Sequence, residues 1–411
     1  MLQSMSALVI MTVVASAFLG PDVSAQDTVV VAAESAPVWG DDARLVRDLR
    51  IGVLEGPDEY IFGDIVAVAV GLNGSIYVYD SQVPVIRQYG PAGRYVRDVG
   101  RDGQGPGEYL GVMGMHVLRD GLLAVWDGEN TRITVYDSAG NYLDSHRVPT
   151  TVTYMANIFA VDTAGYFYIK VVDRSRIGRT PVAHEIRAGQ MTSTGERPTA
   201  LVRVSPGGQV LDSIPLPLEE KGAAFHLATV EGPRWNFPTA VRYAWSNRGY
   251  LVVGRNDRYA FDLLIPGGPV RRIVRDYQPV RTHRAERAQW DAWARYFERG
   301  GGEKYPPTPE TKPAFRDLYV DEDGRIWVDR YVEAVKRDVE PREPGDERPL
   351  YEWHEPSTFD VIGPDGTYLG TVVVPERTRI VVRRGDRVWG IEMGKFDEQY
   401  VVGFQVVGRD G

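Results

Sequence analysis

Cysteine is absent from the 411-residue chain. This absence excludes disulfide bonds, thiolate nucleophiles and zinc sites with cysteine ligands. Histidine is scarce, with 6 residues, and no two of them have the i, i+4 spacing of a helical zinc site. A basic surface is also lacking, because the formal net charge is −9. Binding to nucleic acid is therefore not expected.

Long hydrophobic runs are confined to the N-terminus. Residues 7–19 form an apolar stretch of signal-peptide length, and Val23-Ser24-Ala25 fits the small-residue cleavage rule. No later segment reaches the roughly 18 apolar residues of a membrane span. We predict a signal peptide over residues 1–25, one mature domain over residues 26–411, and export to the periplasm or the extracellular space. A buried N-terminal strand or helix is the alternative, because no Lys or Arg precedes the apolar stretch.

Glycine and proline, by contrast, are plentiful, with 44 and 27 residues, and they punctuate a repeat. The motif Gly-Pro-x-Glu-Tyr occurs at residues 56–60 and again at residues 105–109, and "GSIYVYD" matches "GLLAVWD". The copies are 49 residues apart at Gly56 and 47 residues apart at Asp80. Self-similarity at this period indicates stacked supersecondary units.

Each repeat has the pattern of four short strands joined by tight turns. The sixth repeat ends after its third strand, and "RLVRDLRIG", from Arg44, supplies the missing one, because closing a ring removes an unpaired strand edge. The sequence therefore predicts an all-β fold: a six-bladed β-propeller of four-stranded antiparallel blades, closed by an N-terminal strand, with one short helical insert. The predicted inner turns are at Gly74, Gly121, Gly165, Gly249, Gly324 and Gly385, and the outer turns at Gly93, Gly140, Gly208, Gly268 and Gly366.

This repeat pattern resembles the NHL-repeat class of six-bladed β-propellers, most closely over residues 56–148. More narrowly, the GxGPGE motif at residues 103–108, followed by Tyr109, is similar to a loop after the first blade of exported bacterial propellers. The resemblance implies the propeller fold. Because NHL-type propellers are often interaction modules, it also implies a binding role.

The Gly-rich stretch "GRDGQGPGEY", residues 100–109, has two interpretations. A phosphate-binding loop requires Lys and Ser/Thr before a helix, and neither residue follows here. Its partial recurrence as "EGPDEY" favours a hinge between blades, with Tyr109 packed between them and Glu108 hydrogen-bonded to loop amides. A ligand-binding loop is the alternative.

Candidate metal ligands are spread over several repeats. Asp80, Asp127 and Asp329 each lie at the end of a second strand, where equivalent carboxylates could ring a channel and hold a hard cation such as calcium. His116 and His226 could face the same channel. Alternatively, each Asp caps the turn that follows it, as Asp commonly does. No cofactor is predicted, although these residues leave open the binding of a divalent cation.

An insert over about residues 281–313 breaks the β pattern. Trp290, Trp293 and Phe297 have the i, i+3, i+7 spacing of one helix face, and a Pro-rich stretch follows. The helix either packs this face over the ring or forms a lid over a ligand pocket. The candidate ligand-stacking residues are Trp235, Trp290, Trp293 and Tyr305.

Two functions are consistent with these features. The first is an exported, monomeric binding module for a protein, peptide or glycan, because no catalytic motif such as Gly-x-Ser-x-Gly occurs. The second is a metal-dependent hydrolase, lactonase or lyase with its site in the central channel. Propellers of the gluconolactonase and amidating-lyase kinds resemble this predicted architecture, but their ligands do not map residue by residue onto this chain.

Overall fold

A computed structural model describes residues 36–41, 43–148, 159–173, 184–187, 190–193, 198–217, 237–266, 268–299, 306–339 and 345–408. For residues 184–187 and 190–193 it describes the backbone only. The predicted signal peptide and the candidate site residues Trp235, Tyr305 and His226 lie outside these ranges.

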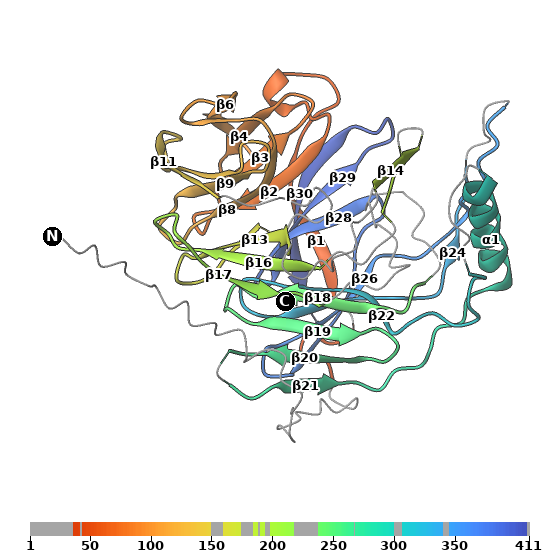
Figure 1. Ribbon diagram of the computed structural model, residues 1–411. Coiled ribbons are helices and arrows are strands. Elements are labelled where there is room, and N and C mark those ends of the chain that lie inside the picture. Colours follow the sequence, from red (N-terminus) through yellow and green to blue (C-terminus); the bar gives the residue numbers. More distant parts are fainter. Residues whose placement is uncertain are drawn as a thin grey trace.

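The chain forms six four-stranded antiparallel sheets, as predicted (Figure 1). Blade 1 contains β2 (Ile65–Val70), β3 (Ile76–Asp80), β4 (Val85–Tyr89) and β5 (Tyr95–Val99), and blade 2 contains β8 (Val112–Val117), β9 (Leu123–Asp127), β10 (Arg132–Tyr136) and β11 (Tyr142–Arg147). Blade 3 contains β12 (Phe159–Val161), β13 (Phe167–Val172), β16 (Thr199–Val204) and β17 (Val210–Pro215), and blade 4 contains β18 (Val241–Trp245), β19 (Leu251–Arg255), β20 (Ala260–Leu264) and β21 (Arg271–Val274). Blade 5 contains β22 (Phe315–Val320), β23 (Ile326–Arg330), β26 (Thr358–Ile362) and β27 (Tyr368–Val373), and blade 6 contains β28 (Thr378–Arg384), β29 (Arg387–Met393), β30 (Gln399–Val407) and β1 (Arg44–Ile51).

Strand β1 closes the ring. It pairs antiparallel with β30 from Arg44 opposite Val407 to Ile51 opposite Val401, and it forms the outer strand of blade 6. The N-terminal strand thus occupies the predicted position. Its pairing covers an edge of β30 that would otherwise expose unpaired backbone groups.

The predicted turns are nearly all correct. All six inner-turn glycines have positive φ, from +55° at Gly385 to +87° at Gly121, which is the left-handed region where glycine has no Cβ penalty. Four of the five outer-turn glycines share this conformation. Gly268 is the exception, because its φ lies outside the positive region.

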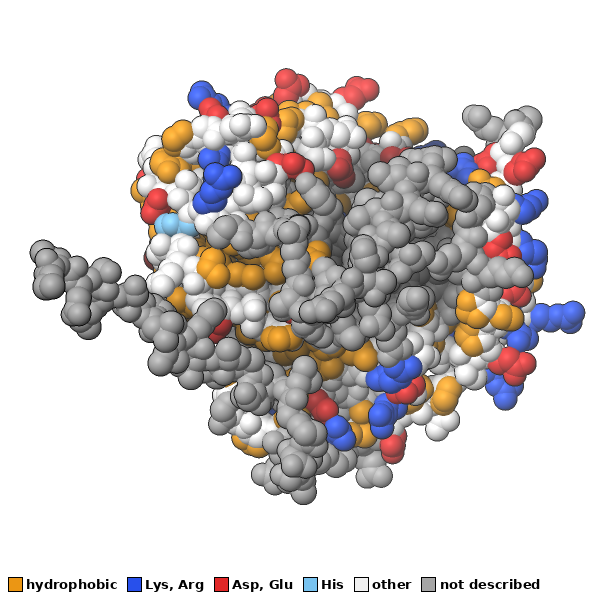
Figure 2. Space-filling model, viewed as in Figure 1, with side chains coloured by type: hydrophobic (Ala, Val, Ile, Leu, Met, Phe, Trp, Pro, Cys, Tyr) orange, Lys and Arg blue, Asp and Glu red, His pale blue; other side chains and the backbone are white. Residues whose placement is uncertain are grey.

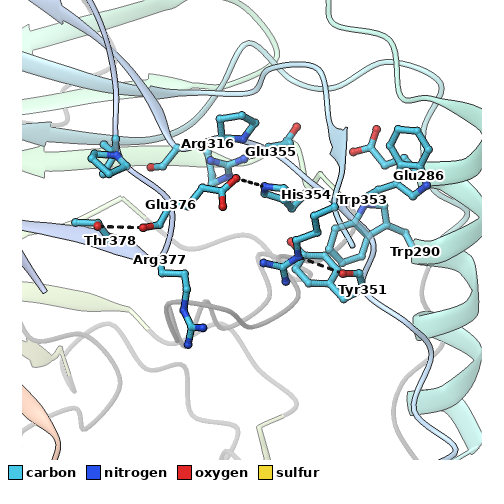
Figure 3. A pocket seen from close by; sticks show the side chains of 15 residues that line it. Glu286, Trp290, Arg316, Tyr351, Trp353, His354, Glu355, Glu376, Arg377 and Thr378 are labelled. Atoms are coloured by element: carbon cyan, nitrogen blue, oxygen red, sulfur yellow. Dashed lines mark hydrogen bonds and ion pairs between the residues drawn. The ribbon is translucent and has the colours of Figure 1, made fainter. Parts of the chain in front are cut away.

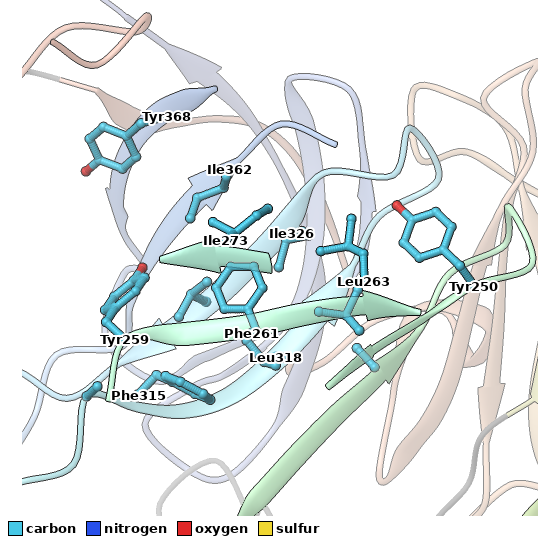
Figure 4. Close-up of a cluster of buried hydrophobic side chains, with 14 residues drawn as sticks. Tyr250, Tyr259, Phe261, Leu263, Ile273, Phe315, Leu318, Ile326, Ile362 and Tyr368 are labelled. Carbon is cyan, nitrogen blue, oxygen red and sulfur yellow. The ribbon is translucent and has the colours of Figure 1, made fainter. Parts of the chain in front are cut away.

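The cores of the fold lie between neighbouring blades. Six hydrophobic clusters each join residues of two adjacent blades. Between blades 4 and 5, Phe261 of β20 and Phe315 of β22 are at most 1% exposed and pack with Ile326 of β23 (Figure 4). Because each blade is covered on both faces, apolar residues occur at both alternating positions of the inner strands.

The loop over residues 100–109 makes the contacts predicted for a hinge. Tyr109 is fully buried; its hydroxyl donates to the Val99 carbonyl (2.9 Å) and accepts from the Ile86 amide (2.9 Å), both in blade 1. The Glu108 carboxylate accepts from the Gly105 amide (2.7 Å). These bonds, with the two-residue parallel pairing of β6 (Arg101–Asp102) and β7 (Glu108–Tyr109), tie blade 2 to blade 1.

The longest insertions lie at one end of the blades. Because strands alternate in direction, the connections to the next blade and those between second and third strands all emerge at the same end. This insert face carries α1 (Arg284–Arg299), β14 (His184–Arg187), β15 (Gln190–Ser193), β24 (Val335–Lys336) and β25 (Trp353–His354), and α1, β14 and β24 lie together at the right of Figure 1. The opposite turn face carries the short glycine turns.

Helix α1 is the predicted helical insert. The Glu286 carboxylate accepts from the His283 amide (3.2 Å), which satisfies a backbone donor that the first turn leaves free. Trp290 and Trp293 are both buried on one face, and the outward face bears charges of both signs, visible at the right edge of Figure 2. The described helices include no stretch long and apolar enough to cross a membrane.

Ring closure generates a stability prediction. Ile51→Ala should lower the free energy of unfolding by about 2–5 kcal/mol, because Ile51 is 1% exposed in the cluster between blades 6 and 1. Val46→Ala, on the same strand but 40% exposed, should change it by at most about 0.5 kcal/mol. Urea denaturation measures both. Equal losses would show that β1 does not contribute to the core as described.

Candidate functional site

A pocket lies beneath α1 on the insert face, with room for about 100 Å3. Its walls come from α1, from the segment around β25 and from the link between β27 and β28, and β22 supplies part of its floor (Figure 3). The residues that line it include Glu286, Trp290, Arg316, Arg337, Tyr351, Trp353, His354, Glu355, Glu376 and Arg377.

A buried ammonium group anchors the floor of the pocket. The Lys312 side chain is fully buried, and its Nζ donates to the Glu286 carboxylate (2.8 Å), the Glu355 carboxylate (2.5 Å) and the Val332 carbonyl (2.8 Å). Burial raises the pKa of Glu286, and the neighbouring Lys312 ammonium limits that rise. Three acceptors around one cation meet the requirement that a buried charge be both paired and hydrogen-bonded.

Arg316 extends this network into blade 5. Its guanidinium donates to Asp329 (2.8 Å) and to Glu355, and it lies over the Tyr331 ring, 4.6 Å from the centroid. The side chains of Arg316, Asp329 and Glu355 are all at most 9% exposed. The floor is therefore a rigid chain of alternating charges that links α1 to an inner strand.

Gln289 fixes the position of α1 over the pocket. Its Nε2 donates to the Trp353 carbonyl (2.8 Å), and its Oε1 accepts from the amides of Glu352 (2.7 Å) and Trp353 (2.8 Å). The Trp353 ring also stacks on His283, with centroids 4.7 Å apart. Helix and β25 thus form one wall.

Several buried nitrogen atoms of residues that line the pocket have no hydrogen-bond partner in the part of the chain that the structure describes. They are Trp290 Nε1, on a side chain that is 4% exposed, Arg316 Nε and the ring nitrogens of His354. His354 Nε2 lies 3.5 Å from a Glu376 carboxylate oxygen, within ion-pair range when the ring is protonated. Since buried polar groups are normally bonded, these nitrogen atoms are suited to hydrogen-bonding groups of a ligand.

The sequence-predicted aromatic residues separate into two groups. Trp290 lines the pocket and packs against Tyr351, with centroids 5.6 Å apart. Trp293 packs against Tyr296 and Phe297 on the same helix and does not line the pocket. Both remain proposals as ligand contacts.

Asp80 and Asp127 occupy equivalent positions and make equivalent bonds. The Asp80 carboxylate accepts from the amides of Gly63 (2.8 Å) and Asp64 (3.0 Å). The Asp127 carboxylate accepts from Leu110 (3.1 Å) and Gly111 (3.1 Å), at the same sequence separations. Each carboxylate therefore fastens the loop that enters its own inner strand.

Asp329 does not share their position, contrary to the expectation of equivalent carboxylates. Asp80 and Asp127 pair with the first residue of their inner strands, whereas that place in blade 5 is taken by Arg330. Asp329 comes one residue earlier, so its side chain points to the other face of the sheet, where it meets Arg316. Metal binding by these residues stays a prediction.

His116 lies on β8 and lines a cavity in the central channel. Burial lowers its pKa; nearby Glu322 opposes this shift and Arg384 adds to it. In the described part of the chain, no group of three or more His, Asp or Glu side chains is placed to hold a metal ion.

Sequence reasoning missed the floor network of Lys312, Glu286, Glu355 and Arg316. Lys312 and Glu355 are 43 residues apart, and Arg316 and Glu355 are 39 apart, so no local motif joins them. One signal was present: Glu286 lies on the same i, i+4, i+7 face as Trp290 and Trp293. A carboxylate in an aromatic stripe indicates a buried partner.

Comparison with known proteins supports the fold. A family model described as "6-bladed beta-propeller" matches residues 45–181. No curated protein matches the chain. Both the family model and the six observed blades thus define the class of the chain as a six-bladed β-propeller.

Solved structures that are similar to this chain are distant in sequence. A DUF4221 family member from Bacteroides vulgatus is 11% identical with a TM-score of 0.48, covering 89% of this chain and 98% of the other. Inactive virginiamycin B lyase from Staphylococcus aureus, with quinupristin, is 11% identical with a TM-score of 0.40, covering 88% and 99%. Regucalcin, a calcium-binding protein from Agrobacterium tumefaciens, is 12% identical with a TM-score of 0.37, covering 89% and 96%.

The floor network generates a second stability prediction. Lys312→Met should destabilise the fold by about 3–5 kcal/mol, because it leaves Glu286 and Glu355 buried without their shared cation. Lys336→Met is the matched control: its ammonium pairs with Glu352 at 3.2 Å but is 57% exposed, so the loss should stay below about 1 kcal/mol. Chemical denaturation at pH 7 compares the two. A small loss in Lys312→Met would mean that the network is dispensable.

Proposed function

We propose that this chain is a binding module that takes a protein, peptide or glycan ligand on its insert face, with the pocket beneath α1 as the main contact. The observation that carries the proposal is a set of buried nitrogen atoms on side chains that line the pocket, Trp290 Nε1, Arg316 Nε and the His354 ring nitrogens, which have no hydrogen-bond partners among the described residues. A ligand with accepting oxygens would satisfy them.

The charges of the pocket favour a polar ligand without a large net charge. Glu286 and Glu355 are already balanced by Lys312 and Arg316. Nearer the rim, Arg377 pairs with Asp397 at 3.3 Å, and Arg337 lies 5.1 Å from the Tyr351 ring centroid. Hydroxyl or amide groups, which both donate and accept, suit such a mixed lining, and the aromatic rings offer stacking surfaces.

We further propose that the module is exported, in line with the apolar stretch at residues 7–19, and that it acts as a monomer. The repeat over residues 56–148 supports placing it with NHL-repeat-like propellers of the exported bacterial kind that carry a GxGPGE-aromatic loop.

The alternative function is a metal-dependent hydrolase, lactonase or lyase that uses the central channel, with a divalent cation such as calcium. Its support is limited to the sequence candidates Asp80, Asp127, Asp329, His116 and His226. The cavity in the channel is lined by aliphatic side chains together with polar ones, among them Asp321 and Glu322. Glu322 is held by Arg384, and Asp321 accepts from Trp327 Nε1. A hard cation needs six to eight oxygen ligands, so this lining favours the binding module.

Trp290→Phe tests the binding role. The change keeps a ring against Phe237, whose centroid is 6.1 Å away, and removes the indole N–H together with part of the buried ring. Ligands would come from a glycan array and a peptide library, and affinity for a pocket ligand should fall about five- to tenfold. The loss of ring volume should lower the melting temperature to a similar extent in Trp290→Phe and in the control below. Trp389→Phe is the control, since its Nε1 is equally buried and unpartnered but lies in blade 6 away from the pocket. Equal effects of the two changes would contradict the proposed pocket.

Metal analysis separates the two functions. We expect purified, dialysed protein to contain less than stoichiometric calcium or zinc and to show no rise in melting temperature when either cation is added. Elemental analysis and thermal denaturation measure these outcomes. A stoichiometric cation that survives dialysis would favour the enzyme.

A further inference from the structure

A cleft at the outer edge of blade 2 is separate from the pocket beneath α1. It has room for about 320 Å3 and opens on the insert face, beside the Gly-rich loop over residues 100–109. The residues that line it are Gln104, Asn130, Arg132, Ser145 and Arg147. All five are polar and none is a carboxylate, although the whole chain has a formal net charge of −9. Strand β11, which carries two of them, lies at the left of Figure 1, on the opposite side from α1.

Two arginines lie opposite each other in this cleft. Arg132 of β10 pairs with Arg147 of β11, and paired residues in an antiparallel sheet point to the same face. The Val148 amide donates to the Thr131 carbonyl (2.9 Å), so the next pair, Arg132 with Arg147, is of the non-hydrogen-bonded kind, in which side chains lie closest. Like charges directly opposite each other destabilise a sheet. An anion between the two guanidinium groups would remove that repulsion.

Arg132 is fixed in position, but its charge is not neutralised. The guanidinium donates to the backbone carbonyls of Gln104 (3.0 Å), Gly105 (2.8 Å) and Glu108 (2.6 Å). Its Nε is buried and has no hydrogen-bond partner among the residues that the structure describes. Because carbonyl groups carry no net charge, these bonds hold the cation in place without cancelling it. The Gly-rich loop therefore acts as a hinge and also presents a positive charge to the cleft.

Arg147 is the more accessible of the two cations. It is exposed and lines the cleft. Within the described ranges, its side chain makes no hydrogen bond and no ion pair. The guanidinium of Arg147 is thus able to bind a ligand without first breaking a contact with these residues.

The nearest carboxylates are directed elsewhere. Glu108 pairs with Arg101 at 2.6 Å. Asp127 accepts from Asn130 Nδ2 (2.6 Å) and fastens the loop that enters β8. Asp144 alternates along β11 with the two residues that line the cleft, so its side chain points to the other face of the strand. None of the three reaches the cleft, which therefore holds two positive charges and no negative one.

We propose that this cleft binds a sulfate or phosphate group, either as the free ion or as an ester on a larger molecule. Two cations without a carboxylate match the charge of a divalent anion, and the N–H fork of a guanidinium matches its oxygens. The side chains of Gln104 and Ser145 add an amide and a hydroxyl, which can donate to further oxygens. The proposal does not depend on the function proposed for the pocket beneath α1, because the two sites share no residue.

Isothermal titration calorimetry on the full chain tests the proposal with sodium sulfate, sodium phosphate and glucose 6-phosphate, each against sodium chloride at matched ionic strength. We expect saturable binding of at least one of them. Tighter binding of glucose 6-phosphate than of phosphate would assign an ester group, and equal or weaker binding would assign the free ion. Arg147→Gln should weaken the binding about tenfold, because it removes a charge-assisted contact. The melting temperature in sodium chloride should not fall, because no partner of Arg147 is lost.

Arg94→Gln is the matched control. Arg94 is also exposed and directly precedes β5, the outer strand of blade 1, and its side chain has no hydrogen bond or ion pair with the described residues. It does not line the cleft. The affinity for the anion should therefore be the same in Arg94→Gln as in the unaltered protein.

Arg147→Glu provides a variant whose effect misfolding cannot imitate. A carboxylate opposite Arg132 replaces a like-charge pair with an opposite-charge pair, so the melting temperature in sodium chloride should rise while anion binding is lost. Absence of saturable binding by all three probes would overturn the proposal. So would equal affinities in Arg147→Gln and Arg94→Gln, or undiminished anion binding by Arg147→Glu.

Discussion

The pairing of β1 with β30 is the constraint on which the rest of the molecule depends. It completes the outer edge of blade 6, so each of the six interblade clusters has two walls. Without a fourth strand in that blade, Leu49 and Ile51 would be missing from the cluster between blades 6 and 1. A ring of sheets is stable as a unit because every blade buries both faces against neighbours. The inner strands, and hence the channel, are held in register by the same closure.

Because the pairing of β1 with β30 closes the ring, the two faces of the propeller can carry different connections between strands. The turn face consists of short hairpins, nearly all with a glycine at positive φ, and it gives access to the channel cavity. The insert face carries α1 and β24–β25, which are joined to each other by Gln289 and to the segment that enters β22 by the buried contacts of Lys312. A pocket built on such supports is rigid, which lowers the entropy lost on binding a ligand. The channel cavity and the pocket are thus separate environments: the cavity combines aliphatic with polar side chains, and the pocket combines aromatic rings with paired charges.

Most of the fold could be predicted from the sequence because its signals are local. Asn73-Gly74 marks a hairpin, and the strand count requires Arg44–Ile51 to complete the last blade. The pocket was less predictable, because Lys312 and Glu286 meet Glu355 only after two insertions have folded together. The position of Asp329 could have been corrected from sequence alone: "IYVYD" and "LAVWD" end in Asp, whereas "IWVDR" has Asp one place earlier. A shift of one residue reverses the face of a strand side chain.

The position of β1 at the start of the ring also orders the events of folding. A ribosome releases β1 long before β30, so the earliest strand has no partner until nearly all of the chain has been made. Blades 1 to 5 can each form from contiguous sequence, but the circle cannot lock until its last hairpin arrives. The ring therefore stays open until β30 has been made, and Leu49 and Ile51 of β1 lack their blade 6 partners until then.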